Sequence, residues 1–476
     1  MPSLTGYETI RMRPRASTVT LLISVLALSV AAVSAEDNHS KSSDDGVPEL
    51  RSLSTFGTYD ALALIFIAVG LAISAAGGVG GGTILVPAMV LIMSFDIKRA
   101  TPVSNLAIVG GAIANAWFNF RKRHPAVDRP LIDSDLALAM IPLVMGGAIV
   151  GTVFAKLLPS YLISLLFVVV LTLGGARTVS KGIKMHRNET NKGEQRESAF
   201  VTEAMGEQRQ TTGYIGVYSP TSFENVEKQT DGVDRESVRG SPCTADTEKL
   251  AQILERERQF SLPKQGVLLI CYVGILAASL GSASVTCNSV AYWALLIAEI
   301  PWIAGFGVYT AIYLYRQHCC KLAVNYAFAV GDIRWTKQNV VRFPLACAGA
   351  GVIAGLFGVG GGIVTGPLMI EMGIVPEVAS ATTALMVLYS SAAATAQFAV
   401  FGLIAWDWAL MMSALAFVVT AVSQVVILGF VRRTGRQSVI VLCIGVTICV
   451  GAVLMTYQSI VSTIEDAGEP FEITVC

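Results

Sequence analysis

Two glycine runs interrupt two hydrophobic stretches of this chain and are its first candidates for chemistry. The first reads GGVGGGTILVP from Gly77 to Pro87, and the second reads GVGGGIVTGP from Gly358 to Pro367. Glycine and proline in an apolar segment free backbone groups that lipid cannot satisfy, so such breaks persist where they face protein or a watery cavity. A matched pair of breaks is typical of transporters built from internal repeats.

The composition defines the class of protein. Hydrophobic residues make up 53% of the chain and charged residues 14%, and the mean hydropathy is +0.61. These values predict a multispanning membrane protein. The 34 basic residues balance the 34 acidic residues, which argues against a partner nucleic acid. The four scattered histidines and the cysteines in apolar segments predict neither a metal site nor a disulfide framework.

The N-terminal region has the pattern of a targeting segment. Basic residues precede an apolar run from Val19 to Val33, so residues 1–35 are expected to be a signal peptide, with an uncleaved signal anchor as the alternative. Residues 36–57 then become lumenal or extracellular, and Asn38 is a glycosylation acceptor in Asn38-His39-Ser40. We expect an integral membrane protein of the secretory pathway, with the plasma membrane favoured because no Lys-Asp-Glu-Leu-like ending occurs.

Ten apolar segments are long enough to enter a bilayer. They cover residues 58–92, 99–120, 133–157, 160–180, 266–286, 289–316, 343–372, 378–402, 406–431 and 437–458. The two that contain the glycine runs are too long for one upright helix and too short for two full crossings. If both are hairpins that return to their starting side, the basic clusters at 121–124 and 432–436 become cytoplasmic, as the positive-inside rule requires.

This topology predicts an all-α polytopic membrane protein with two inverted repeats. Each repeat, 58–180 and 343–458, is a broken helix or re-entrant hairpin followed by three spans. Between the repeats we expect a disordered cytoplasmic loop at 181–265, with a short helix near Asp246–Phe260 as an alternative within it, two linking spans at 266–316 and a cytoplasmic loop at 317–342. Residues 459–476 form an acidic external tail. Half-helix N-termini at the midplane would favour an anion.

The glycine runs, Lys98–Asn105, Met369–Gly373 and Ala379–Thr383 resemble the sulfite exporter TauE/SafE family of anion permeases, and most closely its plant-like branch. The resemblance extends over residues 58 to 458. It implies export of sulfite or sulfur-containing organic anions, driven by an ion gradient. We expect a proton as the coupling ion.

Carried onto this sequence, the resemblance places the substrate against the backbone of the two runs. The implied positions are Gly78, Gly80, Gly81, Gly82 and Pro87 in the first run, and Gly358, Gly360, Gly361, Gly362 and Pro367 in the second. Thr101, Ser104, Asn105, Thr382 and Thr383 are further candidates, as hydroxyl or amide donors to an oxyanion. Close packing through small residues is the alternative for the glycines, and hydrogen bonding within their own helix is the alternative for the others.

Two glutamates are candidates for carrying the coupling proton. Ionisable residues inside spans are rare and usually functional. Glu299 lies deep in an apolar segment, and Glu371 lies just beyond the second glycine run. Capping of the helix break at Pro301, or a hydrogen bond to a neighbouring span, is the alternative for Glu299.

No enzyme motif is present, since the chain lacks a phosphate-binding Gly-x-x-x-x-Gly-Lys-Ser/Thr and a His-Glu-x-x-His. We therefore expect a secondary active exporter that works by alternating access, with no cofactor and no metal. Its partners would be a small anion, a coupling ion and the lipid bilayer, and a homo-oligomer stays open. The alternatives are a membrane scaffold or receptor that uses the 181–264 loop, and a passive anion channel.

Overall fold

A computed structural model describes residues 57–207, 244–434 and 438–465, apart from gaps at 76, 79, 125–126, 286–288 and 330. Within these ranges the fold is helical and contains no strand, although one isolated bridge joins Arg123 to Pro130. The signal segment, Asn38 and most of the acidic tail lie outside the described residues.

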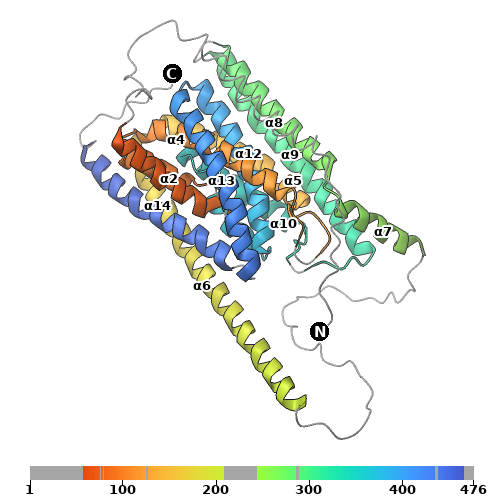
Figure 1. The fold of residues 1–476 in the computed structure, drawn as a ribbon. Coiled ribbons are helices and arrows are strands. Elements are labelled where there is room, and N and C mark those ends of the chain that lie inside the picture. The colour runs from red at the N-terminus through yellow and green to blue at the C-terminus, as the bar shows by residue number, and fades with distance from the viewer. Residues whose placement is uncertain are drawn as a thin grey trace.

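The helices form one bundle in which a five-helix order occurs twice (Figure 1). The first set is α2 (Thr58–Ala75), α3 (Gly82–Leu91), α4 (Ile97–Asn119), α5 (Ser134–Leu157) and α6 (Ser160–Glu207). The helices α7 (Thr244–Arg258), α8 (Leu262–Ala283) and α9 (Val290–Ala323) follow. The second set is α10 (Asn339–Phe357), α11 (Gly362–Glu371), α12 (Pro376–Val400), α13 (Trp406–Thr434) and α14 (Ser438–Glu465).

Eight of the described helices are long and apolar enough to cross a membrane. They are α5, α6, α8, α9, α10, α12, α13 and α14. The structure therefore confirms a polytopic membrane protein. The helix α4 is also 23 residues long, but it carries more polar residues, among them Asn105 and Asn115.

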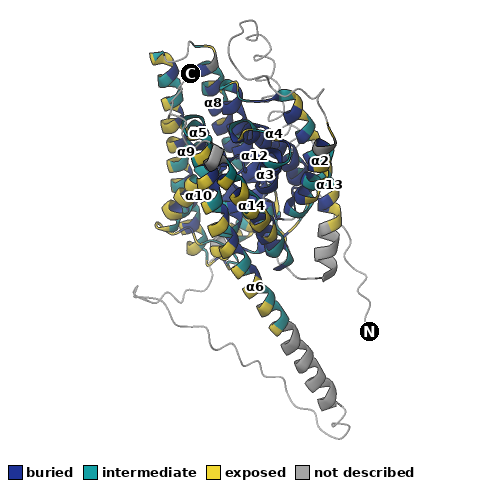
Figure 2. Ribbon diagram, turned by 90° about the vertical axis from the view of Figure 1, so that its left-hand side faces the viewer, coloured by how far each residue is buried: buried dark blue, intermediate teal, exposed yellow. Residues whose placement is uncertain are grey.

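The helices α4 and α12 form the centre of the bundle (Figure 2). Both are buried along almost their whole length and are rich in Ala, Gly, Ser and Thr, which let neighbouring backbones approach closely. The outer helix α9 instead exposes large apolar side chains such as Ile297 and Ile300, as a helix facing lipid does.

Contacts between distant segments define the two ends of the bundle. At one, which we call the Asp96 end, Ser160 Oγ donates a hydrogen bond to Asp96 Oδ1 at 3.0 Å, and the Lys156 ammonium lies 4.6 Å from the centre of the Phe401 ring. At the other, which we call the α7 end, the Asp133 N–H donates to Thr382 Oγ1 at 3.2 Å. The helix α4 therefore runs from the Asp96 end to the α7 end, and α12 runs in the opposite direction.

Each glycine run forms the turn of a helical hairpin. The first hairpin, α2 and α3, returns to the Asp96 end, because α3 ends at Leu91, five residues before Asp96. The second hairpin, α10 and α11, returns to the α7 end, because α11 is followed directly by the start of α12. The two hairpins thus enter the bundle from opposite ends.

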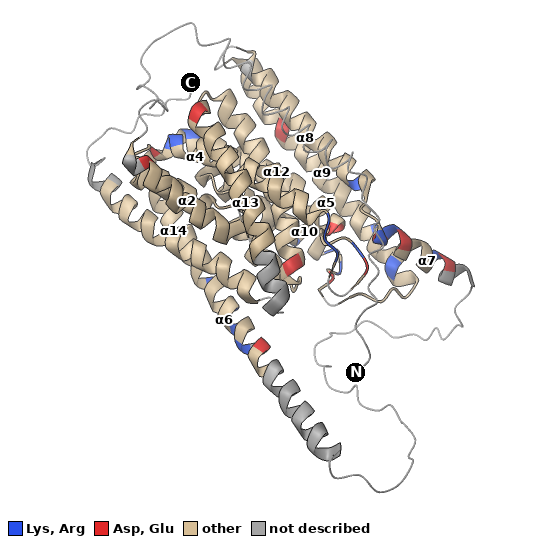
Figure 3. Cartoon of the chain, in the orientation of Figure 1, with Lys and Arg blue, Asp and Glu red and all other residues tan. Residues whose placement is uncertain are grey.

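The segment expected to be a disordered loop is helical at both of its ends. The helix α6 continues to Glu207 and projects beyond the bundle, and α7 occupies Thr244–Arg258, while residues 208–243 lie outside the described part (Figure 1). Both helical stretches are rich in Glu, Gln, Lys and Arg, which are strong helix formers despite their polarity. In α6 local propensity therefore outweighs the low hydrophobicity that predicted a loop, whereas α7 agrees with the short helix given as the alternative near Asp246–Phe260. Charged residues gather on α7 and at the helix ends, and few lie between (Figure 3).

Candidate functional site

The glycine runs reverse the chain because three glycines in each have a left-handed backbone. They are Gly78, Gly80 and Gly81 in the first run and Gly358, Gly360 and Gly361 in the second. The last of each set, with φ of 76° and 74°, is the N-cap of a ten-residue helix, α3 or α11. Residues with a Cβ atom adopt this backbone only under strain, so glycine is required by the geometry of the turn.

The two turns touch each other in the middle of the bundle. A Cβ atom on Gly82 would lie 2.6 Å from Val359 Cα and 2.8 Å from the Gly358 carbonyl oxygen. A Cβ atom on Gly80 or on Gly360 would meet the same two side chains, Ile108 of α4 and Val387 of α12, at 2.8 to 3.1 Å. The absence of side chains at these positions thus lets two segments 280 residues apart pack backbone to backbone.

The central helices hold the turns in equivalent ways. A Cβ atom on Gly78 would lie 2.3 Å from the Ser380 carbonyl oxygen, and one on Gly358 would lie 2.6 Å from the Thr101 carbonyl oxygen.

Two serines add hydrogen bonds to these contacts. Ser104 Oγ donates to the Gly358 carbonyl at 2.8 Å, and Ser390 Oγ donates to the Gly360 carbonyl at 3.2 Å. Both hydrogen bonds hold the second turn, which is therefore fixed by backbone and hydroxyl groups rather than by charges.

This arrangement brings two helix N-termini together. The first N–H groups of an α-helix have no partner within the helix, and the helix dipole gives that end a partial positive charge. Because α3 and α11 begin at adjoining turns, their positive ends share one region in the middle of the bundle. Thr83 Oγ1, on the second residue of α3, is buried without a hydrogen-bond partner. Such a region is suited chemically to an oxyanion.

The remaining predicted residues have other partners. Asn105 Nδ2 donates to the Thr101 carbonyl at 3.3 Å. This is a hydrogen bond within its own helix, which was the alternative to binding an anion. Thr382 accepts the Asp133 N–H at the start of α5, and Thr383 Oγ1 lies 3.6 Å from Met369 Sδ. The prolines Pro87 and Pro367 lie inside α3 and α11 rather than at the turns.

Several residues that contact the turns carried no sequence signal. Ile108 and Val387 look like ordinary core residues, and Ser390 is one of many small polar residues in α12. Their role depends on which face of α4 or α12 meets the turns, and the nearly uniform burial of both helices hides that face from sequence periodicity.

A network of amide side chains joins the first turn to the α7 end. Gln424 Nε2 donates to the carbonyl of Ala75, the last residue of α2, at 2.9 Å and to Asn115 Oδ1 at 2.5 Å. The Lys122 ammonium donates to Asn119 Oδ1 at 2.7 Å and to Gln424 Oε1 at 2.8 Å. These groups form a continuous polar strip between the glycine turn and the end of α4.

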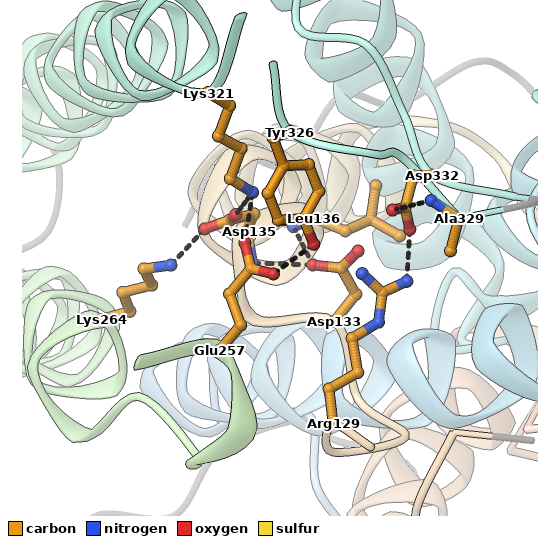
Figure 4. Close-up of polar contacts among 10 residues, drawn as sticks. All are labelled: Arg129, Asp133, Asp135, Leu136, Glu257, Lys264, Lys321, Tyr326, Ala329 and Asp332. Atoms are coloured by element: carbon orange, nitrogen blue, oxygen red, sulfur yellow. Dashed lines mark hydrogen bonds and ion pairs between the residues drawn. The ribbon is translucent and has the colours of Figure 1, made fainter. Parts of the chain in front are cut away.

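A second polar group, which we call the Asp135 cluster, lies at the α7 end (Figure 4). Asp135 pairs with Lys264 of α8 and lies 3.7 Å from the ammonium group of Lys321 of α9. Lys321 also pairs with Glu257 of α7 at 2.6 Å, and Glu257 accepts a hydrogen bond from the Tyr326 hydroxyl at 2.6 Å. The cluster therefore ties α7 to the start of α5 and to both linking helices.

The connection before α5 continues this cluster. Asp133 caps α5 by accepting hydrogen bonds from the N–H groups of Asp135 and Leu136, at 2.9 and 3.1 Å, and Arg129 pairs with Asp332. Burial raises the pKa of Asp133 above its ordinary value, and the neighbouring Asp135 charge acts in the same direction. No group of His, Cys, Asp and Glu side chains suited to a metal ion occurs among the described residues.

Comparisons with known proteins identify a family for the chain. The family model described as "Sulfite exporter TauE/SafE" matches residues 62–219 and 248–454. The chain is 29% identical over 395 residues to "Sulfite exporter TauE/SafE family protein 3" of Arabidopsis thaliana, covering 83% of this chain and 77% of that protein. It is also 29% identical over 399 residues to family protein 2 of the same plant, covering 81% and 80%. No solved structure matches the chain.

Proposed function

Because this chain belongs to the sulfite exporter TauE/SafE family, we propose that it is a secondary active exporter of sulfite or a small organosulfur anion. The observation that carries the proposal is the meeting of two helix N-termini at adjoining glycine turns. Their free N–H groups suit an oxyanion, and Thr83 Oγ1 supplies a further donor without a partner. The glycine backbone allows the anion to approach closely.

We propose that the two five-helix sets are inverted repeats that alternate access to this site. Hairpins that enter from opposite ends would open the site to one side and then to the other. The basic residues around Arg121 to Arg129 favour a cytoplasmic position for the α7 end, by the positive-inside rule. The amide strip from Lys122 to Ala75 then supplies the polar path from the cytoplasm to the first turn.

Transport by purified protein tests this proposal. Protein in liposomes should carry at least one of sulfite, sulfate and sulfoacetate with saturable kinetics. The Gly361→Val variant should lose this flux, because a branched side chain cannot adopt a φ of 74° without strain. The Gly361→Asn variant should keep more of it, because asparagine tolerates this backbone best after glycine.

The same measurement separates the rival functions. Flux that does not saturate would indicate a channel. No flux of any of the three anions, from protein that remains folded in lipid, would overturn the proposed substrate class. Normal flux in the Gly361→Val variant would show that the second turn does not serve the substrate.

A further inference from the structure

The linking helices bury a carboxyl group that the glycine turns do not use. The helix α9 directs Ile297 and Ile300 outward, with 58% and 57% of each residue exposed, but it directs Glu299 inward, with 2% exposed. A carboxyl group inside a spanning helix is costly, and a packing role alone would be served as well by a neutral side chain. The contacts of Glu299 therefore indicate what the group does.

Glu299 is held by two neutral side chains from two other helices. Gln397 Nε2 of α12 lies 2.9 and 3.0 Å from the two carboxyl oxygens, and Ser279 Oγ of α8 lies 3.0 Å from Oε1. Gln397 Nε2 and Ser279 Oγ are themselves 2.8 Å apart. No ion pair within the described residues includes Glu299. No fixed cation therefore stabilises its negative charge.

These three side chains can accommodate the carboxyl group with or without a proton. The ionised group accepts the hydrogen bonds just described. A protonated group needs an acceptor, and Gln397 Oε1 is buried without a hydrogen-bond partner. Rotation of the Gln397 amide exchanges its oxygen and nitrogen, and the Ser279 hydroxyl either donates or accepts. A single proton can therefore bind while all three side chains remain hydrogen-bonded.

We propose that Glu299, Gln397 and Ser279 form a proton-binding site, the Glu299 site, which couples a proton gradient to the movement of α12. This inference rests on the proposed transport function. Gln397 lies seven residues after Ser390 and therefore on the same face of α12, two helical turns along. Ser390 holds the Gly360 carbonyl of the second turn. The helix α12 thus connects the carboxyl group to the anion region.

The helices α8 and α9 form the opposing surface of the Glu299 site. Trp302 Nε1 of α9 donates to the Cys271 carbonyl of α8 at 3.2 Å, and the Trp302 ring fills the space beside Gly274. These contacts fix the two helices to each other. A change in the hydrogen bonds of Glu299 therefore displaces α12 relative to a rigid helix pair.

The Glu299 site lies near the Asp96 end, which is therefore the side from which the proposed proton would enter. Gln397 lies three residues before the end of α12, which is about 5 Å along the helix axis. The helices packed around the site carry these other titratable groups: Lys264, Cys271 and Tyr272 of α8; Tyr292, Tyr309, Tyr313, Tyr315, Arg316, His318, Cys319, Cys320 and Lys321 of α9; Glu377 and Tyr389 of α12; Asp135 and Lys156 of α5; and Arg342 and Cys347 of α10. Lys156 lies at the Asp96 end, whereas Asp135, His318, Lys321 and Arg342 lie towards the α7 end.

Two measurements test the proposal, and the first does not depend on transport. Infrared difference spectra of the full-length protein in lipid nanodiscs, recorded as the pH is changed, should contain the C=O band of a buried protonated carboxyl group. The Glu299→Gln variant should lose the part of that band that is due to Glu299, while any part due to Asp133, whose pKa burial raises, should remain. The Glu371→Gln variant should keep the whole band, because Glu371 is exposed at the end of α11. A band that is unchanged in Glu299→Gln, or its absence from the unaltered protein, would overturn the proton-binding site.

The second measurement follows sulfite flux in liposomes with and without an imposed pH gradient. The unaltered protein should carry sulfite several-fold faster with the gradient, and Glu299→Gln should carry it at one rate under both conditions. An equal response in both proteins would overturn the coupling role. If no protein carries sulfite while the infrared band still depends on Glu299, the proposed substrate fails and proton binding at Glu299 stands.

Discussion

At the glycine turns, segments distant in sequence are joined by backbone atoms and small hydroxyl groups, whereas the Asp135 cluster joins them through fully charged side chains. The turns are surrounded by apolar residues such as Ile108 and Val387, and the cluster is partly reached by water. The first kind of contact depends on shape, and the second depends on charge and screening. Substitutions in the two regions should therefore differ in how much stability they cost and in how that cost responds to salt and pH.

Gly80→Ala should produce the largest loss of stability. The new Cβ atom would adopt a φ of 82° and would lie 2.8 Å from Ile108 Cγ2, so backbone strain and overpacking add to about 2–5 kcal/mol. In Gly361→Ala the nearest atom, Ala354 Cβ, is 3.3 Å away, so mainly the strain of about 1–2 kcal/mol remains. Thermal unfolding of the solubilised protein, followed by size-exclusion chromatography, measures both. Equal losses of stability in the two variants would show that backbone strain, without overpacking, sets the cost of a side chain in the turns.

Gly82→Ala tests the contact between the two turns without backbone strain. Gly82 has an ordinary helical φ, but its Cβ atom would displace the Val359 backbone, and we expect a loss of about 1–3 kcal/mol. The matched control is Gly366→Ala in α11, where the nearest atom, Thr383 Oγ1, is 4.0 Å away. That control should be neutral or more stable by up to about 1 kcal/mol, because alanine is the better helix former. If Gly82→Ala left the stability unchanged, this would contradict the close approach of the turns.

Asp135→Asn tests the charged region. The Asp135 side chain is 14% exposed and faces two lysines, so its loss removes the ion pair of Lys264 and leaves Lys321 with Glu257 alone, and should cost about 1–3 kcal/mol. Asp128→Asn is the control, because its side chain is 60% exposed and its pairs with Arg123 and Arg258 should contribute less than about 1 kcal/mol. Added salt should reduce the difference between Asp135→Asn and the unaltered protein, but not the effect of Gly82→Ala. A salt-independent loss at Asp135 would indicate a packing role.

The two regions also differ in how much of them could be predicted. The membrane class, the helical fold and the positions of the turns follow from composition and from two runs of glycine that are contiguous in sequence. The Asp135 cluster could not be predicted, because Asp135, Glu257, Lys264 and Lys321 come from four helices and no spacing relates them. Glu299 was recognisable as an ionisable residue in an apolar segment, but its partners Ser279 and Gln397 were not. A sequence pattern reveals which face of a helix is buried, but not which helix lies against it.

Acidification should produce the smallest difference in stability between the two regions. The α7 end contains titratable side chains, whereas the glycine turns contain none. Burial lowers the pKa of His124 below its ordinary value of 6.5, and the nearby Arg129 charge acts in the same direction. The unfolded chain therefore binds the proton at higher pH than the folded protein, and stability is lost as the pH falls through about 6.5. Acidification has the opposite effect on stability through Asp133, because the raised pKa of this group favours the folded state at lower pH.

Because these two effects oppose each other, the contribution of His124 to acid sensitivity is measured by comparing variants with the unaltered protein. The unfolding temperature of His124→Gln should fall less on acidification than that of the unaltered protein, whereas Gly82→Ala should fall as much as the unaltered protein does. If Gly82→Ala also changed the acid response, the turns and the α7 end would be coupled through α4, and the division between a region held by shape and a region held by charge would not stand.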